Sequence, residues 1–238
     1  MEQFPGRIIT VRKFLNEEVS VDWLVDGLLA NVGWTLLIGR KGVGKTTFAI
    51  QLASAMQAGD LFMGRETKRS KVLFCQFDSF PIEWKAILTR LAPEEKWFTM
   101  VNCPSYSLDN EAYVSSICNL IGQVQPNFVI WDSLYKLSRR NINTTQVQET
   151  IETLLLICPE IPFMVIHHPP HTELRASGHN SIGGTCSNEW HLLKNKLVID
   201  KSRLSGEKEI LLSRDDNGLW LLKEDEQEVS GVLTMPII

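Results

Sequence analysis

The sequence feature that most constrains the fold is the glycine-rich stretch GRKGVGKT at residues 39–46. It matches the pattern G-x-x-x-x-G-K-[ST], follows directly on the apolar run TLLIG, and precedes a segment with helical spacing of apolar residues. In such a strand–loop–helix unit the glycines let backbone amides turn inward around a phosphate, and the helix N-terminus adds positive partial charge. The pattern therefore predicts a phosphate-binding loop between a buried strand and a helix.

The polar residues of this loop have distinct expected roles. Lys45 is expected to reach the β- and γ-phosphates of a bound ATP, Thr46 to ligate Mg²⁺, and Thr47 to bind the α-phosphate. The alternative is a glycine-rich turn that matches by chance, and the flanking strand and helix argue against it. The predicted nucleotide-binding residues are Gly39, Arg40, Lys41, Gly42, Val43, Gly44, Lys45, Thr46 and Thr47.

Apolar strand-like segments alternate with amphipathic segments along most of the chain, an order typical of a parallel sheet. Strands are expected at 35–39, 72–77, 98–102, 128–132 and 162–167, and helices at 45–57, 81–91, 110–123 and 145–158. The last part lacks helices, and antiparallel strands at the sheet edge are expected at 190–200, 209–213 and 219–222. The predicted fold is α/β, with a mostly parallel central sheet flanked by helices and antiparallel strands added at the C-terminal end.

Composition and charge exclude several classes of protein. The 238 residues are 44% hydrophobic and carry a net charge of -4, which fits a globular chain and argues against coating by nucleic acid through bulk charge. The five cysteines form no C-x-x-C pair, so a reducing cytoplasm is expected rather than a disulfide or zinc framework. No apolar run approaches the ~18 residues of a membrane helix, so membrane association is not expected.

A carboxylate that holds Mg²⁺ is expected at the end of a strand neighbouring the phosphate loop. The run FVIWD at 128–132 supplies one, because Asp132 follows four apolar residues. The alternative is that Asp132 ends the strand and caps the following helix. Together with Thr46, Asp132 is the predicted metal site.

In their order along the chain, these motifs resemble those of the RecA/KaiC-like ATPases, and within them the RepA-type branch of plasmid replicative helicases. The resemblance covers most of the chain, at 21–56, 72–79, 128–134, 163–171, 176–184 and 198–222. It implies a RecA-like P-loop NTPase domain at 21–223, between an N-terminal arm at 1–20 available for contact with another subunit and a tail at 224–238. It also implies ATP and Mg²⁺ as cofactors and a homo-oligomeric ring or filament, with a hexamer expected.

The family usually places a glutamate after the second strand to polarise the attacking water, whereas this chain has Asp78 there. Aspartate is shorter by roughly 1.5 Å, and a misplacement of about 1 Å can cost on the order of 10²-fold in rate. Asp78 is the favoured catalytic base, with slow turnover. The alternatives are that Glu83 replaces it, that Asp78 caps the helix at 81, or that the protein is mainly a nucleotide-dependent switch.

Two histidines, His167 and His168, end a buried strand, and the resemblance implies that one of them senses the γ-phosphate, with His167 the candidate chosen. A structural role is one alternative. A zinc site is the other, built from these two with His171, His179 and Cys186, although the spacing fits no standard zinc pattern.

Two cations in DKSR, Lys201 and Arg203, resemble residues that ring-forming relatives insert into the neighbouring subunit's nucleotide site. In that role they would stabilise charge on the transferring phosphoryl group. The alternative is a solvated, charged hairpin.

Two segments, 133–148 and 169–184, correspond by resemblance to the loops that hold single-stranded DNA in RecA-like rings. The first contains no acidic residue, and its Tyr135 is available to stack on a base. The alternative is that both are solvated surface loops. The candidate DNA-contacting residues are Lys136, Arg139, Arg140 and Arg175.

Together these observations predict an oligomeric ATPase that depends on single-stranded DNA, or a helicase, in replication, recombination or mobile-element maintenance. The competing hypotheses are a nucleotide-controlled switch or loader that unwinds nothing, and a nucleotide-binding scaffold without useful turnover.

Overall fold

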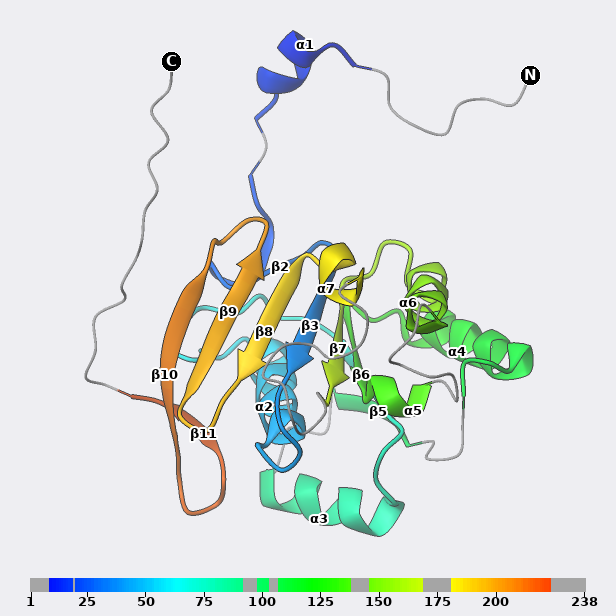
Figure 1. Ribbon diagram of the computed structural model, residues 1–238, viewed down its shortest axis with the longest axis vertical. Coiled ribbons are helices and arrows are strands. Elements are labelled where there is room, and N and C mark those ends of the chain that lie inside the picture. The colour runs from blue at the N-terminus through cyan, green and yellow to red at the C-terminus, as the bar shows by residue number, and fades with distance from the viewer. Residues whose placement is uncertain are drawn as a thin grey trace.

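A nine-stranded sheet forms the centre of the molecule, with helices on both of its faces (Figure 1). The computed structural model describes residues 9–18, 20–91, 98–102, 107–137, 146–168 and 181–223. The strands of this sheet are β3 (Trp34–Ile38), β4 (Val72–Gln76), β5 (Phe98–Asn102), β6 (Phe128–Asp132), β7 (Phe163–His167), β8 (Asn188–Leu192), β9 (Lys196–Ser202), β10 (Lys208–Arg214) and β11 (Trp220–Leu222).

The order of the strands across the sheet is β11-β10-β9-β8-β3-β7-β6-β4-β5. Strands β3 to β8 pair in parallel, whereas β9, β10 and β11 continue the sheet in antiparallel pairing. Every residue of β3, β4, β6 and β7 is buried, as expected for parallel strands that are covered on both faces. This architecture confirms the predicted fold class.

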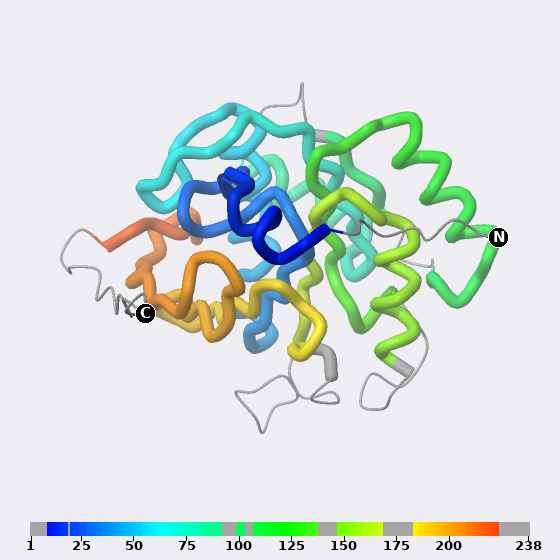
Figure 2. The backbone as a smooth tube through the Cα atoms, turned by 90° about the horizontal axis from the view of Figure 1, so that it is seen from above, coloured from blue at the N-terminus to red at the C-terminus, as the bar shows by residue number. Residues whose placement is uncertain are grey.

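Two pairs of helices cover the two faces of the sheet. The first pair is α2 (Lys45–Ala58) and α3 (Pro81–Leu91), and the second is α4 (Glu111–Val124) and α6 (Gln146–Ile157). The strand residues alternate between the two cores: Leu37 packs on the first side, and Leu36 and Ile38 pack on the second. In Figure 2, α4 and α6 (green to yellow-green) lie together on one side, away from the orange and red C-terminal strands.

The predicted segment at 190–200 proves to be two strands. β8 and β9 are joined by a turn in which Leu193 N donates to Lys196 O (2.8 Å). β8 also pairs in parallel with β3, so the expectation that every C-terminal strand is antiparallel is wrong for this one. The apolar residues on both sides of Lys194 and Asn195 conceal the turn, because a short interruption in an apolar run is also compatible with one long strand.

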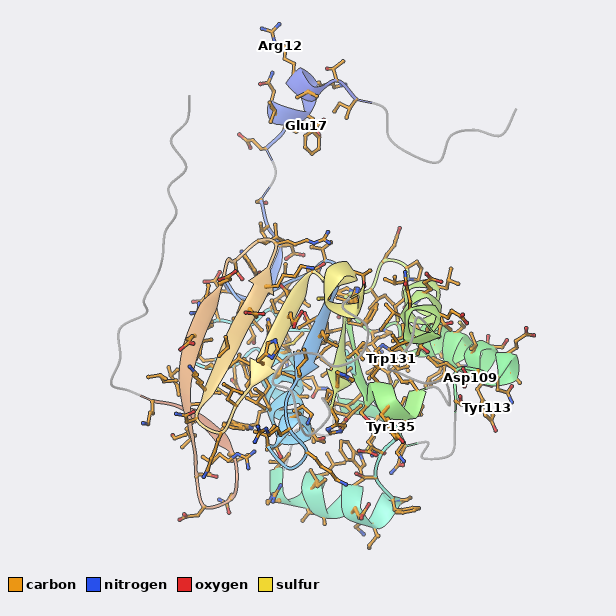
Figure 3. All side chains as sticks on the ribbon, in the orientation of Figure 1. Arg12, Glu17, Asp109, Tyr113, Trp131 and Tyr135 are labelled. Atoms are coloured by element: carbon orange, nitrogen blue, oxygen red, sulfur yellow. The ribbon has the colours of Figure 1, made fainter. Side chains whose placement is uncertain are left out.

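Five short elements were not predicted: α1 (Val11–Leu15), β1 (Trp23–Val25), β2 (Leu29–Ala30), α5 (Leu134–Leu137) and α7 (Ser181–Thr185). α1 stands apart from the sheet, as the labels on Arg12 and Glu17 in Figure 3 show. Residues 1–8, 19 and 224–238 lie outside the described part, so the proposed arm and tail stay predictions. No helix in the described ranges is long and apolar enough to cross a bilayer.

The sheet brings the carboxyl ends of its parallel strands to one edge, towards which the arrowheads of β8, β3 and β7 point in Figure 1. The register places Ile38 opposite His167, and Asp132 opposite both Ile166 and Gln76. The chain leaves β3 towards β4 and later returns to both sides of β3, which makes the end of this strand a topological switch point. Open α/β sheets bind their ligands at such a point.

Candidate active site

The predicted phosphate loop lies at the carboxyl end of β3 and leads directly into α2. Gly44 is the N-cap of α2, with a φ of 97°, and as a glycine it has no side chain with which to cap the helix. Phe48 N donates to Gly44 O (2.9 Å) and closes the first turn. The amides of the first residues of α2 are therefore not capped by the preceding side chain and are oriented to bind an anion.

Close packing of β8 against the loop explains the first glycine. A Cβ at Gly39 would lie 2.7 Å from Leu192 O and 2.9 Å from Val43 Cγ1, closer than real Cβ atoms come. Only glycine fits there without moving the backbone of β8 or the loop. The loop is thus shaped by the strand beside it as well as by its own sequence.

Lys45 is the buried cation of the loop, with 3% of its surface exposed. Its Nζ donates to Gly39 O (2.6 Å) and Arg40 O (3.0 Å). Burial lowers the pKa of Lys45 from 10.5 to about 8, while Asp132 and Asp78 act in the opposite direction. A phosphate beside this ammonium would offset the cost of burying its charge, so the geometry favours an anion at the loop.

The buried ammonium predicts that Lys45 makes a pH-dependent contribution to stability. Below pH 8 both the folded and unfolded chains carry the proton, and the folded state bears the full cost of the buried charge. Between pH 8 and 10.5 the unfolded chain binds more protons, so the Lys45 contribution to the free energy of unfolding rises with pH. Relative to Lys45→Met, the wild-type chain should gain about 1–2 kcal/mol between pH 7 and pH 9.5.

Chemical denaturation of both chains at both pH values measures this gain. Comparing the two chains cancels the titration of other groups, including the buried thiols of Cys158 and Cys186, whose pKa values are raised by burial. A difference in stability that stays constant with pH would contradict the lowered pKa of Lys45.

The predicted metal residues are brought into contact. Thr46 Oγ1 donates to Asp132 Oδ2 (2.6 Å), although the two residues lie 86 positions apart. Asp132 is buried at the end of β6, and burial raises its pKa, against the effect of the Thr46 hydrogen bond. A hydroxyl and a carboxylate beside a phosphate loop form the oxygen donor set that Mg²⁺ prefers, so these residues fit the ion.

Asp78 lies just beyond β4, where its carboxylate is shared between His168 and Lys136. Its Oδ2 is 3.7 Å from His168 Nε2, and its Oδ1 is 3.9 Å from Lys136 Nζ. His168 contributes most to lowering the pKa of Asp78, and Lys136 and Lys41 add to the effect. The carboxylate is therefore ionised at neutral pH, as a general base must be.

The alternative base, Glu83, is engaged elsewhere. Its Oε2 accepts a hydrogen bond from Phe80 N (2.9 Å), which caps the N-terminus of α3. The capping function considered for Asp78 is thus supplied by Glu83.

The two histidines have different surroundings. His167, chosen from the sequence as the sensor, is fully buried in β7. His168 is partly exposed and faces Asp78. The structure therefore places His168, rather than His167, beside the candidate base.

The zinc alternative is not assembled by the described residues. His171 and His179 lie outside them, and Cys186 Sγ contacts Gly183 O at 3.2 Å. Burial raises the pKa of Cys186 to about 11, which keeps it a thiol. The described residues whose ligand atoms do cluster are a different set, Glu189, His191 and Asp200.

The candidate trans-acting cations lie at the end of β9. Lys201 Nζ donates to Gly183 O (2.7 Å) and Gly184 O (3.2 Å), so it is bound to α7 of its own chain. Arg203 is exposed. Of the two, Arg203 is the side chain that is available to another subunit.

Of the candidate DNA contacts, Lys136 lies in α5, close to Asp78, and its neighbour Tyr135 is 58% exposed (Figure 3). Arg139, Arg140 and Arg175 lie outside the described residues.

A pocket of about 820 Å³ adjoins the phosphate loop, bounded by residues 38–43, the segment 191–195 and Arg214. Arg214 is not among the site residues predicted from the sequence. A usable signal is present, because the turn DDNG at 215–218 places Arg214 opposite Trp220 in a hairpin.

Comparison with known proteins gives a family and a fold. A family model described as an AAA domain matches residues 4–173. The crystal structure of a KaiC-like protein from the hyperthermophilic archaeon Pyrococcus horikoshii OT3 is similar, with a TM-score of 0.64 at 14% sequence identity over 84% of this chain and 93% of that chain. No curated protein matches the chain. At this identity the structural likeness establishes a KaiC-like, RecA-type fold.

Proposed function

The chain belongs to the AAA domain family of P-loop NTPases, and from this premise we propose that it is a Mg²⁺-dependent ATPase that works as an oligomer on single-stranded DNA. On this proposal, its function is similar to that of the RepA-type replicative helicases. The observation that carries the ATPase part is the convergence of the buried Lys45 and the Thr46–Asp132 pair at one phosphate loop.

Each of these residues has a defined task in hydrolysis. The amides at the start of α2 bind the phosphates, and Lys45 supplies a positive charge that is desolvated and fixed in place. Asp78 accepts the proton of the attacking water, and His168 and Lys136 hold its carboxylate in position. Mg²⁺, held through Thr46 and Asp132, would neutralise charge on the phosphate oxygens.

The contacts of Asp78 also support coupling to DNA. One partner, Lys136, lies two residues before the segment 138–145, and the other, His168, immediately precedes the segment 169–180. These segments belong to the two candidate DNA-binding loops. A shift of either loop on binding DNA would therefore move a side chain that positions the base, which links DNA binding to turnover.

Assembly is expected to complete the site. The exposed Arg203 is the candidate that enters the nucleotide site of the next subunit, where an arginine typically adds about 10³–10⁵-fold to kcat. Lys201 is expected to position α7 in the same interface, because it already binds the backbone of that helix.

A second candidate function is a nucleotide-controlled switch or loader. The observation that favours it is the shorter Asp78, whose carboxylate is engaged by His168 and Lys136 and so is restrained from reaching a water. Slow hydrolysis would then time a change in assembly rather than drive movement.

ATP hydrolysis measured with and without single-stranded DNA distinguishes the two functions. The proposal predicts that DNA stimulates turnover, that the stimulation weakens between about 50 and 200 mM salt, and that turnover per chain rises with protein concentration as subunits assemble. Turnover that is indifferent to DNA at both salt concentrations would support the switch instead. Turnover per chain that stays constant while assembly changes would contradict a cation acting between subunits.

A further inference from the structure

Arg214, the last residue of β10, borders the phosphate loop but is not among the predicted site residues. It forms part of the wall of the 820 Å³ pocket, together with the loop and the segment 191–195. That volume lies within the range of pockets that hold small ligands. Among the side chains that line the pocket, Ile38, Val43, Leu192 and Leu193 are apolar.

The partner of Arg214 across the hairpin, Trp220, is fixed firmly to the nucleotide-binding elements. Its indole Nε1 donates to Gly44 O (3.1 Å), within the phosphate loop. Its backbone N–H donates to Gln51 Oε1 (2.8 Å), and its carbonyl accepts from Gln51 Nε2 (3.1 Å) on α2. Trp220 is also buried, so the indole has a set position relative to the loop.

The guanidinium of Arg214 lies over this indole. Its Cζ is 4.3 Å from the centre of the Trp220 ring, a cation–π distance. Its Nη2 approaches Gly44 so closely that a methyl group on that glycine would overlap it. Within the described part of the chain, no ion pair joins Arg214 to a carboxylate.

We propose that Arg214, supported by Trp220, is the surface on which the base of the bound nucleotide stacks, an inference that rests on the proposed ATPase function. Arg214 lines the pocket, whereas the Trp220 indole beneath its guanidinium does not. A planar guanidinium over an aromatic ring has a second face on which another ring can stack.

Other groups of the site already bind the phosphates, which favours the base as the ligand of Arg214. The phosphates have the amides of α2 and Lys45. Among the described residues, the planar side chains that line this pocket are Arg40, His191, Asn195 and Arg214, and of these Arg214 has its guanidinium over the buried indole of Trp220. The arginine thus extends the nucleotide site from the loop to the C-terminal hairpin. Because stacking on a guanidinium does not read hydrogen-bonding groups, the contact serves any purine.

Competition against a fluorescent ATP analogue tests this assignment, with ATP and inorganic tripolyphosphate as the two competitors, both with Mg²⁺. Arg214→Ala should weaken ATP binding about tenfold, equivalent to about 1.4 kcal/mol, and leave tripolyphosphate binding unchanged. Arg214→Lys keeps the positive charge but lacks the planar guanidinium, so its affinities for ATP and tripolyphosphate should match those of the alanine variant. Because Arg214 is exposed, both variants are expected to fold, and thermal unfolding checks this.

Three results would overturn the inference. An equal loss of ATP and tripolyphosphate affinity would assign Arg214 to the phosphates. Wild-type affinity for ATP in Arg214→Lys would show that charge alone is needed, and wild-type affinity in Arg214→Ala would show that the residue is not needed. In each of these three results the wild-type chain still binds ATP, so the proposed ATPase function stands. If the wild-type chain itself failed to bind ATP, both the inference about Arg214 and the proposed function would be overturned.

Discussion

Replacing Lys45 with alanine is expected to abolish measurable ATP hydrolysis, with a fall of at least about 10²-fold in turnover and a matching loss of ATP affinity. The reason is the burial of this ammonium: its charge is desolvated and fixed at the phosphate loop, where no water or exposed lysine can replace it. Phosphate release under single-turnover conditions, with protein in excess over ATP, measures the effect even if turnover is slow.

The matched control for this variant is Lys85→Ala. Lys85 is an exposed lysine on α3, so its removal changes the net charge by the same amount without touching the loop. Hydrolysis at the wild-type rate by Lys45→Ala would contradict the assignment of the phosphate loop. Equal losses in both variants would show that net charge, rather than the buried ammonium, governs activity.

The second large effect is expected for Asp78→Asn. Asparagine keeps the shape of the side chain but cannot accept the proton of the attacking water, so turnover should fall by about 10²- to 10⁴-fold. ATP binding should remain, because Asp78 is not part of the phosphate loop. Single-turnover hydrolysis and ATP titration together separate the loss of chemistry from a loss of binding.

Glu83→Gln is the matched comparison for this prediction. The glutamine retains an oxygen that can accept from Phe80 N, so helix α3 keeps its cap and turnover should hold. Unchanged turnover in Asp78→Asn, with a loss in Glu83→Gln, would transfer the role of base to Glu83. Unchanged turnover in both would remove both carboxylates from the mechanism.

The parallel part of the sheet was predictable because its signals are local. Strands buried on both faces appear as uninterrupted apolar runs, and the helices between them show apolar residues at helical spacing. The contact between Thr46 and Asp132 was also predictable in outline, because strand ends meet at one edge of a parallel sheet. The distance between these side chains was not, since it depends on the register of β6 against β7 and β4.

The features that escaped prediction depend on contacts between distant segments. Whether β8 pairs with β3 is decided by what covers that side of the sheet, which no local pattern records. Which histidine faces Asp78 depends on the exact end of β7, because consecutive strand residues point in opposite directions. Arg214 joins the site through Trp220, whose partners Gly44 and Gln51 lie about 170 residues earlier in the chain.

Residues 39–46 are expected to bind a nucleoside triphosphate with Lys45 as the main positive charge, and the roles of Asp78, Asp132 and Arg214 all require this binding. Isothermal titration of the wild-type chain with ATP, with and without Mg²⁺, tests it most directly. The predicted result is one saturable site per chain, strengthened by Mg²⁺ and lost in Lys45→Ala. Two results would contradict the claim. One is that the wild-type chain binds no ATP at millimolar concentrations with Mg²⁺ present, and the other is that Lys45→Ala binds ATP as well as the wild-type chain does.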